Sequence, residues 1–141
     1  MLKKINPIIS PELLKILAEM GHTDEIVICD GNMPVYTVGK NVVRLDGHGV
    51  PEILEAVLEY FPLDAKTEKP VTLCDWTGPR PDIWDAYKKI ILESEEADKF
   101  RNGFNMLKDP EFMGRVRNAY CLVATSEKSL AANIILKKGL L

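Results

Sequence analysis

Histidine and cysteine are the scarcest reactive residues in this chain. The 141 residues include two histidines and three cysteines, and no two cysteines have the C-x-x-C spacing. A structural zinc site needs clustered Cys or His ligands, so we expect neither a metal nor a cofactor. The chain has an odd number of cysteines, Cys29, Cys74 and Cys121, and each of them lies in an apolar run. This pattern predicts reduced, buried structural cysteines.

The chain also lacks a positive charge excess and a long apolar run. Lys plus Arg number 18 against 21 for Asp plus Glu, which gives a net charge of -3. A nucleic-acid partner is therefore not expected, because little charge is available to neutralise phosphates. No run approaches the roughly 20 apolar residues of a membrane span, and Pro7 interrupts the N-terminal segment before a signal-peptide core. We expect a cytoplasmic protein with no membrane partner.

Three common catalytic motifs are missing as well. The chain has no G-x-G-x-x-G fingerprint, no phosphate-binding P-loop and no G-x-S-x-G elbow. The pair Gly47-x-Gly49 is too short to replace the first of these. These absences argue against a nucleotide-dependent enzyme and against a serine hydrolase.

Helical and extended patterns alternate along the sequence. Apolar residues at helical spacing predict helices over Ser10–Met20, Val50–Phe61, Pro81–Glu96 and Pro110–Ala119. Apolar and β-branched runs predict strands over Glu25–Cys29, Val42–Leu45, Val71–Cys74, Gly103–Leu107, Tyr120–Thr125 and Asn133–Lys137. The alternation predicts an α/β protein, with helices packed on an at least partly parallel sheet. We expect one domain over residues 1–141, and a solvated charge run at Glu93–Glu96.

His22 and Asp30 are the candidates for chemistry. His22 follows Gly21, which is placed to end a helix, and the negative end of the helix dipole favours a protonated imidazole. Such a group can act as a general acid or base, or it can simply be a helix-ending residue. Asp30 follows a strand, where ligand groups gather in α/β proteins. Trp76 and Trp84 flank a Gly/Pro loop and form either core packing or a stacking wall for a sugar.

Several strings together resemble the D-ribose pyranase/L-fucose mutarotase family. They are residues 8–22, which include Ser10-Pro11-Glu12-Leu13-Leu14 and end in Gly21-His22, then residues 24–28, Asp30, Pro34, Val43-Arg44-Leu45-Asp46-Gly47, and residues 133–139. The opening and the Arg44–Gly47 string resemble the fucose branch, whereas Gly21-His22-Thr23-Asp24 also occurs on the ribose side. The match covers about residues 1–63 and 109–139, and residues 64–108 match poorly.

The resemblance implies a three-layer α/β/α subunit in a homo-oligomeric ring, often a decamer, with active sites between subunits. It implies a cofactor-independent isomerase that interconverts the anomers of L-fucose or a related monosaccharide. His22 would be the proton donor, Asp30 would bind the sugar, and Asn133 would hold it from a Tyr-x-Asn motif. D-ribose pyranase activity, or sugar binding without catalysis, is the alternative.

This chain departs from the family at two sugar-binding positions. Ala131 replaces the tyrosine of Tyr-x-Asn, and Asp109 replaces a basic residue. Tyr120 is a candidate to supply the lost aromatic group, and Lys108 or Arg115 to supply the lost charge. We expect these changes to affect the choice of sugar more than the chemistry at His22.

Overall fold

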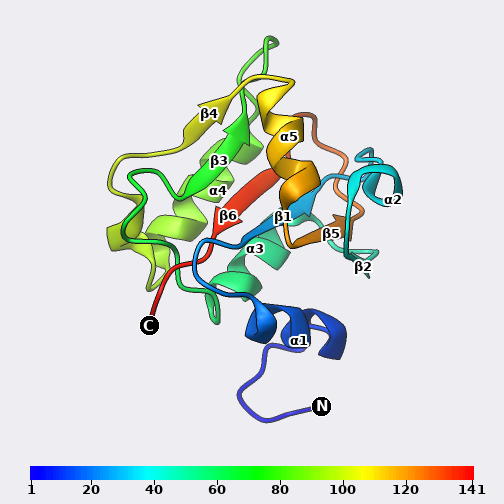
Figure 1. Cartoon of the computed structure of the whole chain (residues 1–141), viewed down its shortest axis with the longest axis vertical. Coiled ribbons are helices and arrows are strands. Elements are labelled where there is room, and N and C mark those ends of the chain that lie inside the picture. Colours follow the sequence, from blue (N-terminus) through cyan, green and yellow to red (C-terminus); the bar gives the residue numbers. More distant parts are fainter.

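A six-stranded sheet forms the centre of the computed structural model, which describes all of residues 1–141 (Figure 1). The strand order is β2-β5-β1-β6-β3-β4. The strands are β1 (Glu25–Cys29), β2 (Val42–Leu45), β3 (Val71–Cys74), β4 (Asn105–Leu107), β5 (Cys121–Thr125) and β6 (Ile134–Lys137). Strand β6 runs antiparallel to β1 and β3, whereas the other neighbouring strands pair in parallel. The expected α/β class with a partly parallel sheet is confirmed.

Helices cover both faces of this sheet. They are α1 (Pro11–Glu19), α2 (Val35–Val38), α3 (Val50–Leu58), α4 (Ile83–Glu93) and α5 (Glu111–Asn118), with a 3₁₀ turn at Ala97–Phe100. Helix α1 begins where predicted, because the Ser10 hydroxyl accepts the Leu13 N–H at 3.1 Å and Pro11 fits the first turn. None of these helices is long and apolar enough to cross a membrane.

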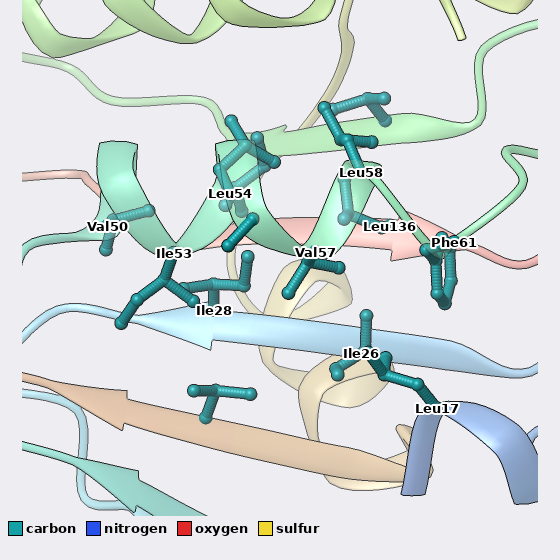
Figure 2. Packing of buried hydrophobic residues seen from close by; sticks show 14 of the residues in the cluster. Leu17, Ile26, Ile28, Val50, Ile53, Leu54, Val57, Leu58, Phe61 and Leu136 are labelled. Carbon is teal, nitrogen blue, oxygen red and sulfur yellow. The ribbon is translucent and has the colours of Figure 1, made fainter. Parts of the chain in front are cut away.

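Two apolar clusters, one on each face of the sheet, make the three layers. Ile26 and Ile28 of β1 pack in the larger cluster with α1, α3 and α4, whereas Val27 and Cys29 pack in the smaller one with α2 and α5. This alternation is the period of two expected for a strand. Figure 2 shows α3 lying over β1, with Ile53 and Val57 on the side of the helix that faces Ile28 and Ile26, and Leu58 on the opposite side. Burial of these side chains is the main favourable term in the folding of such a subunit.

Two local expectations need correction. Helix α2 is absent from the helices predicted above, because four residues are too few to show a helical period. Glu96 is not part of a solvated charge run: it is buried, and its carboxylate accepts the Leu63 N–H at 2.6 Å and the Lys99 ammonium at 3.1 Å. A charged residue can be buried when it is paired and hydrogen-bonded in this way.

The strand directions give the sheet two chemically different ends. The carboxyl end, as we use the term, holds the residues just after β1 and β4 and just before β6: Asp30, Asp109, Ala131 and Asn133. The amino end holds the residues just before β1 and β5, His22 and Tyr120, and both chain termini lie on that side with α1 (Figure 1). The candidate residues, which come from both halves of the sequence, therefore divide between the two ends of the sheet.

Candidate functional site

Asp30 and Asn133 form a paired unit at the carboxyl end. Because Ile28 pairs with Ile134, the residues that end β1 and begin β6 are neighbours. The Asp30 N–H donates to Asn133 Oδ1 at 2.8 Å, and Asn133 Nδ2 donates to Asp30 Oδ2 at 3.1 Å. Asp30 Oδ1 also accepts the Asn32 N–H at 2.9 Å. The strand register and three hydrogen bonds thus fix a nearly buried carboxylate.

Ala131 and Asp109 lie at this same end. Ala131 has a φ of 52°, in the left-handed region, and its carbonyl accepts a hydrogen bond from Trp84. Asp109 is exposed. Burial raises the pKa of the Cys74 thiol, and the charges of Asp109 and Asp75 add to this rise. Asp109 therefore brings a carboxylate close to the carboxyl ends of β3 and β4.

His22 lies at the amino end, beside a buried carboxylate. Its Nε2 is 3.1 Å from Asp64 Oδ1, and the side chains are 30% and 3% exposed. Burial opposes the charge on Asp64, but hydrogen bonds from Thr67, His22 and the Lys66 N–H lower its pKa below the usual value. Asp64 is therefore an acceptor at neutral pH, which favours a proton on Nε2 and leaves Nδ1 for other partners.

The Asp64 backbone is firmly held. The Asp64 N–H donates to the Lys137 carbonyl at 3.1 Å, and the preceding residue, Leu63, forms an isolated β-bridge with Lys138. The Leu63 N–H donates to the Glu96 carboxylate. A side chain at Gly139 would collide with the Leu63 backbone. The carboxylate that contacts His22 is thus anchored to the end of β6.

A hollow of about 480 Å³ opens in front of His22. Its lining includes His22, Tyr60, Lys138 and the C-terminal Leu140 and Leu141. The Lys138 ammonium donates to the Leu17 and Met20 carbonyls at 2.7 and 2.5 Å, so it satisfies the end of α1. The imidazole of His22 therefore borders an open hollow whose lining is mostly apolar.

Tyr120 and Arg115 also belong to the amino end. The Tyr120 hydroxyl donates to Glu19 Oε2 at 3.2 Å, and burial and this carboxylate raise the pKa of the phenol. The Arg115 guanidinium pairs with the Glu25 carboxylate and donates to Thr72 Oγ1 at 2.9 Å. Neither residue lies beside Ala131 of the same chain. Within one chain Arg115 is paired with Glu25 at the opposite end of the sheet from Asp109, whereas Lys108 is exposed beside Asp109. Both residues stay candidates to supply the missing charge.

One chain does not bring the proposed proton donor to the proposed sugar-binding pair. His22 precedes β1 and Asp30 follows it, and five extended residues span about 16 Å. The carboxylate that contacts the imidazole within the chain is Asp64, not Asp30. No group of three or more His, Cys, Asp or Glu side chains has the arrangement of a metal site.

Sequence reasoning did not foresee three contacts, those that Asp64, Trp84 and Tyr87 make with the candidate residues and their neighbours. Asp64 follows the apolar run Phe61-Pro62-Leu63, and a lone acid in such a place is a sign of a buried polar group. Trp84 and Tyr87 donate to the carbonyls of Ala131 and Ala132, and both rings are buried. Of the two interpretations of the tryptophans, core packing fits the buried Trp84, whereas Trp76 is 38% exposed.

Two of the three thiols are buried as predicted, whereas Cys74 is not. Cys29 and Cys121 are buried, Cys74 is half-buried, and all three are free. Burial raises the pKa of Cys29 and raises that of Cys121 to about 12. These thiols are therefore poor nucleophiles.

Comparisons with known proteins agree with this fold. The family model described as the RbsD / FucU transport protein family matches residues 3–141. The fucose mutarotase of Mus musculus is 40% identical, over 99% of this chain and 95% of the relative. The crystal structure of the Streptococcus pneumoniae fucose mutarotase in complex with L-fucose has a TM-score of 0.91 and 39% identity, over 99% of each chain. FucU from Bifidobacterium longum has a TM-score of 0.88 and 45% identity, over 97% of this chain and 98% of that one.

The family match extends beyond the two stretches on which the sequence resemblance rests. Residues 64–108 also lie within the part spanned by the family model and by these relatives. This segment supplies β3, α4 and β4, which complete the sheet and one helical layer. The chain therefore belongs to the RbsD/FucU family.

Proposed function

We propose that this protein is a mutarotase that interconverts the α and β anomers of L-fucose or a related monosaccharide. The observation that carries the proposal is the half-exposed His22 imidazole, paired with buried Asp64 at the edge of an open hollow. Full-length relatives that are named fucose mutarotase support it. In this proposal the whole chain, residues 1–141, is one mutarotase domain.

The reaction requires proton transfer and no redox step. A pyranose opens when its ring oxygen receives a proton and its anomeric hydroxyl loses one, and closure on the other face reverses both transfers. His22 is the general acid/base in this scheme, and Asp64 orients the imidazole through Nε2. A positioned proton transfer typically accelerates a reaction by about 10²–10⁴. Because mutarotation already proceeds in water, this factor is sufficient.

Asp30 and Asn133 are the proposed sugar-binding pair. Each Asp30 oxygen accepts one hydrogen bond from the protein and keeps a second lone pair for a sugar hydroxyl. Asn133 keeps one N–H of its amide. Two neighbouring hydroxyls of a pyranose match this arrangement. Where the family has a tyrosine and a basic residue, this chain has Ala131 and Asp109, which leave open space and a negative charge. Asp30 and Asn133 therefore select a sugar without help from a tyrosine or a basic side chain at those positions.

A second copy of the chain completes the site in this proposal. His22 and Asp30 lie at opposite ends of β1, so a sugar that meets both groups must lie between two subunits. We infer a homo-oligomeric ring, with a decamer as the expected size, in which Tyr120 of one subunit approaches the carboxyl end of the next. Light scattering at micromolar concentration tests this directly, and a clean monomer would contradict the shared site.

The activity itself is tested by saturation-transfer NMR between the α and β anomeric protons. L-fucose, D-ribose and D-galactose are compared with buffer alone, which also separates a mutarotase from a D-ribose pyranase. We expect exchange of L-fucose to exceed the buffer rate and to survive exhaustive chelation. Binding of a sugar without faster exchange of any of them would identify a non-catalytic sugar-binding protein.

The proposed compartment is the cytoplasm. Three reduced thiols, two of them buried, are suited to a reducing environment. Fractionation of the native source with antibody detection checks this assignment.

A further inference from the structure

Helix α4 holds the segment that carries Asn133. The Trp84 Nε1–H donates to the Ala131 carbonyl at 2.8 Å, and the Tyr87 hydroxyl donates to the Ala132 carbonyl at 2.6 Å. Trp84 is 5% exposed and Tyr87 is fully buried. Because residues three apart share one face of a helix, the two aromatic donors reach two consecutive carbonyls.

These bonds act where the backbone is strained. Ala131 has a φ of 52°, a conformation that residues with a side chain seldom adopt. The turn at Ala131 leads the chain from exposed Leu130 to Ala132, which is fully buried, and then into β6. Such strain persists only where surrounding contacts impose it. The two aromatic donors supply such contacts, and Asn133 is the next residue along the chain.

The contacts continue from Asn133 to the proposed sugar-binding carboxylate. Asn133 Oδ1 accepts the Asp30 N–H, and Asn133 Nδ2 donates to Asp30 Oδ2. Helix α4 is thus linked to Asp30 through the Ala131–Asn133 turn. A small shift of this turn would move the Asn133 amide relative to the carboxylate, and binding geometry is sensitive to displacements of this size.

We propose that Trp84 and Tyr87 are positioning residues for the sugar: they set the place of the Asn133 amide, and through it that of the Asp30 carboxylate. This inference rests on the proposed function, in which Asp30 and Asn133 bind the monosaccharide. It gives α4 an indirect part in substrate binding, through the turn that carries Asn133.

The test uses variants that remove one donor and keep an aromatic side chain. Tyr87→Phe deletes only the hydroxyl, whereas Trp84→Phe replaces the indole and its N–H with a smaller phenyl ring. Ile91→Val is the matched control, because Ile91 is fully buried one turn further along α4 and has no polar atom. For each variant of the full-length protein, anomer exchange gives KM and kcat, and a crystal structure gives the distance from Asp30 N to Asn133 Oδ1.

We expect each donor variant to raise KM about three- to tenfold, as loss of one hydrogen bond does, and to leave kcat within about twofold. The Asp30–Asn133 distance should lengthen in both donor variants and remain 2.8 Å in the control. Unchanged KM and an unchanged distance in Trp84→Phe would overturn the inference even if Tyr87→Phe fails to fold. If the wild-type protein does not accelerate exchange of any sugar, the proposed function fails, and the crystallographic distances alone decide the positioning role.

Discussion

The two ends of the sheet hold their functional side chains in different ways. At the carboxyl end, Asp30 and Asn133 terminate paired strands, so the register of the sheet brings them together and backbone groups complete the network. At the amino end, His22 lies in a loop and meets Asp64, 42 residues away in the chain, through one side-chain contact. The first arrangement is preorganised and nearly buried, as binding requires. The second leaves a partly exposed imidazole, as proton exchange requires.

The largest expected effect is at the amino end. His22→Ala should lower the rate of anomer exchange by about 10²–10⁴, because the proton carrier is removed. The fold should be retained, since the His22 side chain is 30% exposed. Saturation-transfer NMR with L-fucose measures the loss.

His48→Ala is the matched control for this variant. His48 pairs with Glu52 at the start of α3 and is not among the candidate residues. It should retain wild-type exchange. Near wild-type exchange in a folded His22→Ala protein would remove His22 from the mechanism and direct attention to Tyr120.

Asp64→Asn should have the next largest effect. The side-chain amide of the new asparagine can donate as well as accept, so it no longer fixes a proton on Nε2 of His22. We therefore expect kcat to fall by roughly 10². Glu68→Gln is the control, because it removes a charge from an exposed residue of the same loop. Equal activity in both variants would show that Asp64 is only structural.

Asp30→Asn tests the carboxyl end by itself. Loss of a charged acceptor should raise KM about tenfold or more, with a smaller change in kcat. The comparison between the two ends would fail if Asp30→Asn mainly lowered kcat while Asp64→Asn mainly raised KM. Exchange rates over a range of sugar concentrations separate these cases.

Ala131→Tyr should produce a smaller change. The left-handed backbone already carries a Cβ at this position, so the substitution adds a ring without a new class of strain. We expect KM for L-fucose to change by about two- to fivefold while kcat stays nearly constant, since the contact serves ground and transition states alike. If no kinetic constant changes for any sugar, residue 131 does not face the substrate.

The smallest effect concerns acid stability. The pKa of Asp64 lies below the usual 3.8 in the folded protein, so its charge stabilises the fold above about pH 4. This contribution is lost as the pH falls through the folded-state value. Thermal unfolding between about pH 5 and pH 2 should therefore show a shallower decline for Asp64→Asn than for wild type. Parallel curves would contradict the assignment.

Much of the fold could be predicted because its signals are local. Ser10 and Pro11 mark the start of α1, and the residues of β1 have the alternating contacts that place Ile26 on one face and Val27 on the other. The candidates His22 and Asp30 likewise stood out from their flanking elements. Helix α2 and the buried state of Glu96 could not be predicted. Helix α2 is too short to show a helical period, and the burial of Glu96 depends on a partner far along the chain.

The amino-acid sequence by itself determined the α/β class, the family and the residue types available for acid/base chemistry, because capping, periodicity and motif strings are properties of neighbouring residues. Only the tertiary structure decided which groups meet. It paired His22 with Asp64, Asp30 with Asn133, and the Ala131 carbonyl with Trp84. It also separated His22 from Asp30 by the length of β1. Such contacts depend on strand order and direction, which packing of the whole chain selects and no local pattern encodes.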